Sequence, residues 1–244
     1  FVKLKIEYKN MANYSLEIGN ALNAAWEYAK KYGLLIAVIY LLTDLLAGGL
    51  DQISGPSVNQ EAYQALGEAI GRQDWESAGS IAQSLNTGFP VSGIIGAILK
   101  LIVSVGLYNL ALGLMAGRFS EVTFDAFKLP FATYLKVFVV NLITGIIVFV
   151  SVLCCIIPVF FVAPRIIFAP VYQVEHPEAG IFESISASWN MSSGNTFSLL
   201  GLGFIIVGIA IVGFCCCCIG VYFAEAIELF ALTAAYYQLK GNLQ

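Results

Sequence analysis

Three charged side chains lie inside apolar segments of the chain and are the first candidates for chemistry. Glu225 and Glu228 interrupt the apolar run 219–239, and Arg165 interrupts the apolar run 158–174. Ionised groups are costly inside a bilayer, so they face protein or water there and take partners. Glu225 and Glu228 are three residues apart and share one face of a helix. We therefore expect Arg165 to pair with one or both glutamates.

This intramembrane polar cluster has two interpretations. In the simpler one, buried ion pairs fix how the helices pack and do nothing else. In the other, the cluster lines a polar cavity or a path for protons or ions, because intramembrane ionisable groups mark such pathways. Two carboxylates against one guanidinium leave one carboxylate that must be protonated or hydrated. A proton-coupled step would use such a group, and both interpretations stay open.

Asp44 and Lys100 form a second candidate pair. They interrupt the apolar runs 33–50 and 90–116. At a rise of 1.5 Å per residue, Asp44 lies about 9 Å and Lys100 about 15 Å from the same end of their helices. A flexible lysine side chain bridges that difference.

The cysteines and the histidine are weaker candidates. Cys154 and Cys155 form one group and the four cysteines 215–218 form another, without C-x-x-C spacing. A disulfide or a soft-metal site is conceivable, but small apolar packing residues are the favoured interpretation. His176 precedes a proline in a polar turn, where we expect a surface residue. We therefore expect no metal and no cofactor.

Composition points to lipid as the solvent of this chain. Of its 244 residues 59% are hydrophobic and 11% charged, with a mean hydropathy of +0.81, whereas soluble domains carry about 25% charged residues. The sequence has no P-loop, no G-x-S-x-G and no H-E-x-x-H, which argues against the common soluble enzyme classes. It has no basic patch of the nucleic-acid-binding type. We expect no enzyme and no nucleic-acid partner.

The hydrophobic pattern predicts an all-α fold, a polytopic membrane bundle of about six transmembrane helices. The expected spans are residues 33–50, 90–116, 132–157, 158–174, 196–213 and 219–239. Pro158 should end the third span, and Pro164 and Pro170 should bend or break the fourth.

Helical spacing of apolar residues predicts three interfacial amphipathic helices, at 13–31, 118–130 and 181–193. For 13–31, the alternative is that these are the solvated first turns of the first span. The polar segment 51–89 should form an external hairpin of two short helices, either a lid over a cavity or, as we favour, a surface hairpin without a ligand. Trp26, Trp75 and Trp189 are expected to anchor these segments at the headgroup level.

The distribution of basic residues predicts the orientation. Nine lysines and arginines fall on one side of a six-helix arrangement and Arg72 alone on the other. The positive-inside rule then places both termini in the cytoplasm and the 51–89 hairpin outside. The loop 173–195 must be cytoplasmic, although it carries acids and no Lys or Arg. We divide the chain into an N-terminal extension (1–12), one membrane domain (13–239) and a short tail (240–244).

Two segments of the chain resemble each other. ALNAAW (21–26) aligns with SISASW (184–189), and a membrane helix is expected to begin about seven residues after each. The segment with Phe124 and Phe127 leads into the third span in the same way. One interpretation divides the chain into three units, each an interfacial helix followed by a membrane hairpin, and such repeats are common in transporter-type folds. Coincidence is the alternative.

Residues 119–239 resemble a bacterial membrane family. The resemblance is carried by the spacing from Pro158 to Arg165, by Ser188 and Trp189 before the fifth span, and by the closing YYQL of 236–239. The family is related to the membrane domain that accompanies some glycerophosphodiester phosphodiesterases. The resemblance implies six helices and a home in the bacterial cytoplasmic (inner) membrane, and it implies no activity. The catalytic barrel of those enzymes is absent from this chain.

From these patterns we expect an integral inner-membrane protein, a non-enzymatic scaffold or accessory in envelope or lipid homeostasis. The alternative is a small-solute or ion-coupled transporter that uses Arg165, Glu225 and Glu228. Expected partners are the lipid bilayer and either a second copy of the chain or another membrane protein.

Overall fold

The described part of the chain is helical and contains no strands. The computed structural model describes residues 15–54, 60–85, 91–154, 156–215 and 219–240. The N-terminal extension 1–12 and the tail residues 241–244 lie outside the described residues. The chain divides into two compact units, one made of residues 42–100 and the other of the remaining residues.

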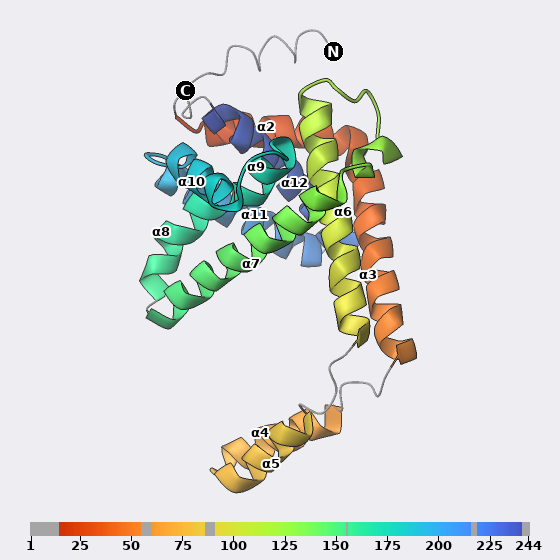
Figure 1. Ribbon diagram of the computed structural model, residues 1–244, viewed down its shortest axis with the longest axis vertical. Helices are drawn as coiled ribbons and strands as arrows, with labels where there is room; N and C mark the ends of the chain where they lie inside the picture. Colours follow the sequence, from red (N-terminus) through yellow and green to blue (C-terminus); the bar gives the residue numbers. More distant parts are fainter. Residues whose placement is uncertain (1–14, 55–59, 86–90, 155, 216–218, 241–244) are drawn as a thin grey trace. The chain divides into compact units, whose positions relative to one another are not determined.

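The larger unit contains most of the helices (Figure 1). In chain order they are α2 (Ile18–Tyr28), the π-helix η1 (Ala29–Gly33), the first turns of α3 (Leu34–Ser54), the end of α6 (Val91–Met115), the 3₁₀ turn η2 (Phe124–Phe127), α7 (Phe131–Cys154), α8 (Ile156–Ile166), α9 (Ala169–Glu175), α10 (Ile181–Met191), α11 (Thr196–Cys215) and α12 (Ile219–Leu239).

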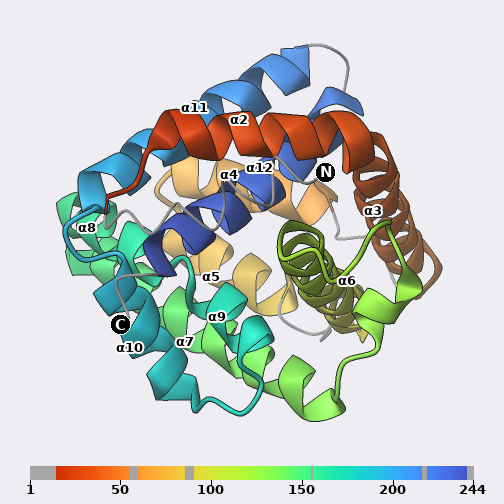
Figure 2. The same ribbon diagram turned by 90° about the horizontal axis from the view of Figure 1, so that it is seen from above.

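Helix α12 forms the core of this unit. It packs against both α2 and α11, and Figure 2 shows α2 crossing over it. Phe230 and Tyr236 of α12 are fully buried, and Tyr28 of α2 stacks on Phe230 with ring centroids 5.5 Å apart. Gly213 and Gly220 allow the two backbones of the α11–α12 hairpin to approach, since a Cβ at Gly213 would lie 2.6 Å from the Gly220 carbonyl oxygen.

The N-terminal amphipathic segment forms a helix whose small residues face protein. Ala21, Ala24 and Ala25 of α2 are buried, while Asn20, Trp26 and Glu27 are exposed. The π-helical turn η1 joins α2 to α3, and π-bulges commonly mark kinks. Lys30 and Lys31 lie in this turn, at the place where the sequence predicts the change from an interfacial to a membrane helix.

The aligned segments 21–26 and 184–189 share a burial pattern. Ala21, Ala24 and Ala25 expose 0%, 8% and 0% of their surface, and the aligned Ser184, Ala187 and Ser188 expose the same three fractions. The two segments lie in α2 and α10, which both begin shortly before a long apolar helix.

The interfacial helix expected at 118–130 is reduced to one 3₁₀ turn, η2. Thr123 caps this turn, because its hydroxyl accepts a hydrogen bond from the Asp125 amide. The helical spacing of the phenylalanines has a different cause. Phe127 packs over Gly106 of α6, where a Cβ would lie 2.1 Å from its ring. Gly117, with φ of 72°, follows the end of α6. The residue before a proline, here Leu129, disfavours the helical conformation. Little chain therefore remains between Gly117 and Pro130 for a longer helix.

The fourth expected span is broken, as its prolines predict. Helix α8 contains Pro164 and ends at Ile166, and α9 begins at Ala169 with Pro170 in its first turn. Pro158 does not end the preceding helix. Helix α7 ends at Cys154, and Pro158 lies in the first turn of α8, where a missing N–H costs no helical hydrogen bond.

The smaller unit contains the expected pair of short helices. It comprises the end of α3, α4 (Gln60–Gly71), α5 (Trp75–Leu85) and the start of α6. Helices α4 and α5 pack on each other through a tight turn in which Gln73 has φ of 58°. Asp74 caps α5, because its carboxylate accepts a hydrogen bond of 3.1 Å from the Ser77 amide.

Four helices of the described chain are long and apolar enough to cross a membrane, which indicates a membrane protein. They are Ile18–Gly49, Gly93–Met115, Phe131–Leu153 and Thr196–Cys215. The fourth and sixth expected spans are not among them. Helix α8 has 11 residues, and α12 carries two glutamates that lower its hydropathy.

Candidate functional site

The structure does not bring Arg165 to the two glutamates. Arg165 Nε donates a hydrogen bond of 3.2 Å to Thr196 Oγ1 at the start of α11. Its guanidinium carbon lies 4.7 Å from the centre of the Trp189 ring in α10. Glu225 and Glu228 are not among these partners. The expectation assumed a fourth helix that continues to Val174, whereas α8 ends one residue after Arg165.

Glu225 and Glu228 have a different neighbourhood, which includes tyrosines of α3 and α6. Both lie within electrostatic range of Tyr40, and Glu228 also lies within range of Tyr108. Ile227 and Leu229 are buried, but the Glu228 side chain between them is exposed. Glu228 therefore lies on the accessible side of α12, and Glu225 is partly exposed.

The second expected pair does form. Within the smaller unit, Lys100 Nζ lies 2.8 Å from Asp44 Oδ1. Gly96 of α6 lies against Ala47 of α3, with its Cβ position 3.3 Å from the Ala47 Cβ. The ion pair is thus placed at a close approach of the two helices.

The three expected interfacial tryptophans are all exposed, at 48% for Trp26, 69% for Trp75 and 39% for Trp189. Two of them carry a cation over the ring. Lys30 Nζ lies 5.7 Å from the Trp26 ring centre, and Arg165 lies over Trp189. Trp26 also contacts Phe223 of α12 edge to face.

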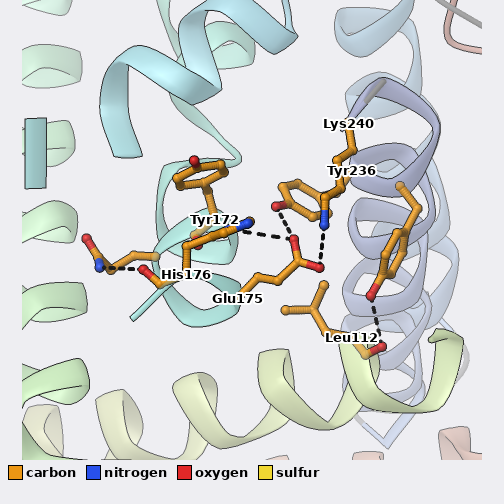
Figure 3. Close-up of polar contacts among 8 residues, drawn as sticks. Leu112, Tyr172, Glu175, His176, Tyr236 and Lys240 are labelled. Atoms are coloured by element: carbon orange, nitrogen blue, oxygen red, sulfur yellow. Dashed lines mark hydrogen bonds and ion pairs between the residues drawn. The ribbon is translucent and has the colours of Figure 1, made fainter. Parts of the chain in front are cut away.

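A polar cluster that the sequence did not predict joins α9 to the end of α12 (Figure 3). Glu175 Oε1 lies 2.7 Å from Lys240 Nζ, and Glu175 Oε2 accepts a hydrogen bond of 2.5 Å from the Tyr236 hydroxyl. The Glu175 side chain is 16% exposed. Each carboxylate oxygen thus has a strong donor, and charge-assisted hydrogen bonds of this kind are the stronger ones in proteins. We call Glu175, Tyr236 and Lys240 the α9–α12 clasp.

His176 adjoins this clasp and is partly exposed, as expected. Its ring stacks on Tyr172 with centroids 4.3 Å apart. Its Nδ1 lies 3.8 Å from Glu175 Oε2. The imidazole therefore flanks the carboxylate without displacing Lys240 or Tyr236.

Buried hydrogen bonds hold the turn between α9 and α10 next to the clasp. The Gln173 amide nitrogen donates to the carbonyl oxygens of His176 and Ala179, and its oxygen accepts from the Ser184 hydroxyl. Lys136 Nζ of α7 donates to the carbonyl oxygens of Pro177 and Ala179 at 2.6 and 3.2 Å. These contacts come from α7, α9 and α10 and hold the turn in place.

The loop 173–195, which has no Lys or Arg of its own, is contacted by lysine side chains from other parts of the chain. Lys136 comes from α7 and Lys240 follows α12. The sequence contained one sign of this arrangement, an acidic loop placed by topology on the side where Lys240 also lies. Glu175 and Lys240 are 65 positions apart in the chain. Helical periodicity gives no information on contacts between residues so far apart.

The described residues hold no group of three or more histidine, cysteine or acidic side chains that could bind a metal. Cys215 is an exposed free thiol. Cys155 and the cysteines at 216–218 lie outside the described residues, so the expectation for the cysteine groups falls largely outside them as well.

Comparison with known proteins identifies no relative of the chain. No family model, no curated protein and no solved structure matches the chain.

Proposed function

We propose that the chain is an integral protein of the bacterial cytoplasmic membrane with about six spans and cytoplasmic termini. Four apolar helices support the membrane placement. The clustering of Lys30, Lys31, Lys136 and Lys240 on one side of the proposed topology supports the orientation. The shared burial pattern of 21–26 and 184–189 supports an internal repeat. The resemblance of residues 119–239 to the bacterial membrane family remains part of this proposal.

Within that membrane, we propose a non-enzymatic scaffold or accessory role in envelope or lipid homeostasis. The α9–α12 clasp is the observation that carries this proposal. Its carboxylate is mostly buried, and its two oxygens contact Lys240 and Tyr236. A catalytic carboxylate needs a free lone pair or a proton in reach of a substrate. A carboxylate that is mostly buried between two helices and has a donor on each oxygen instead stabilises their packing.

Proteoliposomes that contain the purified chain test this proposal. A scaffold should carry no proton or cation flux above that of empty liposomes, and Glu175→Gln should lower the thermal stability while leaving the flux at that baseline. The matched control is Glu121→Gln, which alters an exposed carboxylate outside the clasp. A protein-dependent flux in the unaltered chain contradicts a purely structural role.

Ion-coupled transport is the second candidate because of Glu228. Glu228 is exposed while its neighbours Ile227 and Leu229 are buried, which packing explains poorly, and intramembrane carboxylates mark ion pathways. The transport proposal now rests on Glu225 and Glu228 near Tyr40, without Arg165. Glu228→Gln should abolish a proton-driven flux and preserve stability if this candidate holds. Lost stability without any flux excludes it.

A further inference from the structure

Arg165 is held in place by contacts that leave most of its hydrogen-bonding capacity unused. A guanidinium has five N–H donors. In Arg165 the Nε–H donates to Thr196 Oγ1, and one face of the group lies over Trp189. No carboxylate of the described chain pairs with it. The two terminal nitrogens form the fork with which arginine binds carboxylates and phosphates.

The backbone around Arg165 is fixed as well. Ser188 Oγ donates a hydrogen bond of 2.8 Å to the Arg165 carbonyl oxygen and accepts one of 3.2 Å from the Phe168 amide. A single buried hydroxyl thereby bridges the break between α8 and α9. The adjacent residues Ser188 and Trp189 thus position the backbone and the side chain of the same arginine.

The surroundings of the guanidinium favour an anion. Thr196 is the first residue of α11, and the first amides of a helix lack intrahelical acceptors and present a partial positive charge. A phosphate would accept hydrogen bonds from the terminal guanidinium nitrogens of Arg165 and from these first amides.

Next to these polar groups lies an exposed apolar surface. Phe161 and Phe197 contact each other edge to face at 6.0 Å, and they are 47% and 74% exposed. Helix α11 begins its apolar span at Thr196. A ligand that matches both the guanidinium fork and the exposed phenylalanines has a phosphate and a hydrocarbon chain.

We propose that Arg165, Trp189 and Thr196 bind the phosphate of a phospholipid headgroup, with Phe161 and Phe197 against its acyl chains. The site rests on the proposed membrane placement of α11. A lipid is chosen over a free phosphate because the guanidinium lies at the start of a membrane helix beside apolar surface that only a hydrocarbon tail would cover.

Native mass spectrometry of the full chain released from detergent tests the site with three probes. These are phosphatidylglycerol, diacylglycerol with the same tails, and inorganic phosphate. We expect phosphatidylglycerol to bind and Arg165→Gln to weaken that binding about tenfold, the loss of a charge-assisted contact. The control Lys128→Gln, which alters an exposed base paired with Asp125, should bind as the unaltered chain does.

Other outcomes overturn the proposal. Equal binding of diacylglycerol shows that no phosphate is recognised, and competition by inorganic phosphate at the lipid's own concentration shows a site for free phosphate. Unchanged lipid binding in Arg165→Gln excludes Arg165. If that variant does not fold, Arg165→Lys decides, since it keeps the charge without the fork and should bind several-fold more weakly; unchanged binding there contradicts bidentate recognition. These failures leave the flux and stability tests of the proposed function unaffected.

Discussion

At the scale of single residues, we expect substitution of Glu175 to have the largest effect on stability. Glu175→Gln removes the ion pair with Lys240 and replaces a charged acceptor of the Tyr236 hydroxyl by a neutral one. Removing one member of a mostly buried, charge-assisted contact costs about 1–3 kcal/mol. We expect the free energy of unfolding in detergent to fall by that amount.

A double-mutant cycle supplies the control for this change. Lys240→Met keeps most of the side-chain length and removes the charge, so its effect should overlap with that of Glu175→Gln. Strictly additive losses in the double variant would show that the two side chains do not interact.

The Asp44–Lys100 pair gives a second prediction at this scale. Both residues lie within candidate membrane spans, where an unpaired charge costs about 2.5–3.5 kcal/mol. Asp44→Leu should therefore destabilise the protein in lipid, and Asp44→Leu combined with Lys100→Leu should recover most of the loss, as apolar replacement of ion pairs often does. A double variant less stable than either single variant would contradict this account.

At the scale of elements, close packing of η2 on α6 depends on a glycine. A Cβ at Gly106 would lie 2.1 Å from the Phe127 ring, so Gly106→Ala must displace Phe127 and η2. Overpacking of this kind costs about 1–3 kcal/mol. Gly145→Ala in α7 is the matched control, because nothing lies within 4 Å of its Cβ position. Equal thermal stability of the two variants would show that η2 does not pack as described.

The cap of α5 predicts a pH dependence. Hydrogen bonds from Ser77 hold the pKa of Asp74 below its usual value. A carboxyl group with a lowered pKa in the folded state stabilises the helix at neutral pH, and this stabilisation is lost as the pH falls through the folded-state pKa. Amide exchange in α5 should therefore accelerate on acidification relative to α4, and Asp74→Ala should accelerate it several-fold at neutral pH. Asp74→Asn retains an acceptor and should remove the pH dependence while keeping much of the protection.

The boundaries of most elements follow from the sequence alone because apolar runs and helix breakers are local features. Helix α12 begins and ends where the run 219–239 does, and Pro170 marks the break after α8. The segment 118–130 was predicted as a longer helix because the spacing of Phe124 and Phe127 satisfies helical periodicity. Periodicity does not report that Phe127 fills the space over a glycine of another helix.

The candidate site was harder to predict than the fold. The expected pairing of Arg165 with the glutamates places it within one span over 158–174, whereas α8 ends directly after it and the side chain contacts α10 and α11. Glu175 and Lys240 meet only through tertiary packing. Asp44 and Lys100 were predicted correctly because both belong to helices joined as neighbours by one hairpin, so that counting along each helix was sufficient.

At the scale of the whole molecule, the distribution of charge and apolar surface is consistent with the proposed topology. Long apolar helices would cross the membrane, the acidic α4–α5 hairpin would lie outside, and the clasp would lie at the cytoplasmic end with Lys136 and Lys240. In this arrangement the acidic loop 173–195 obeys the positive-inside rule through cations that other helices supply.

Reporter fusions test this central claim most directly. Alkaline phosphatase, which is active only outside the cytoplasm, and green fluorescent protein, which fluoresces when folded inside it, are each inserted after Gln73 in the α4–α5 turn and fused to the C-terminal end. The account predicts active phosphatase and no fluorescence at Gln73, with the reverse result at the C-terminal end. Phosphatase activity at the C-terminal end, or at neither position, would contradict it.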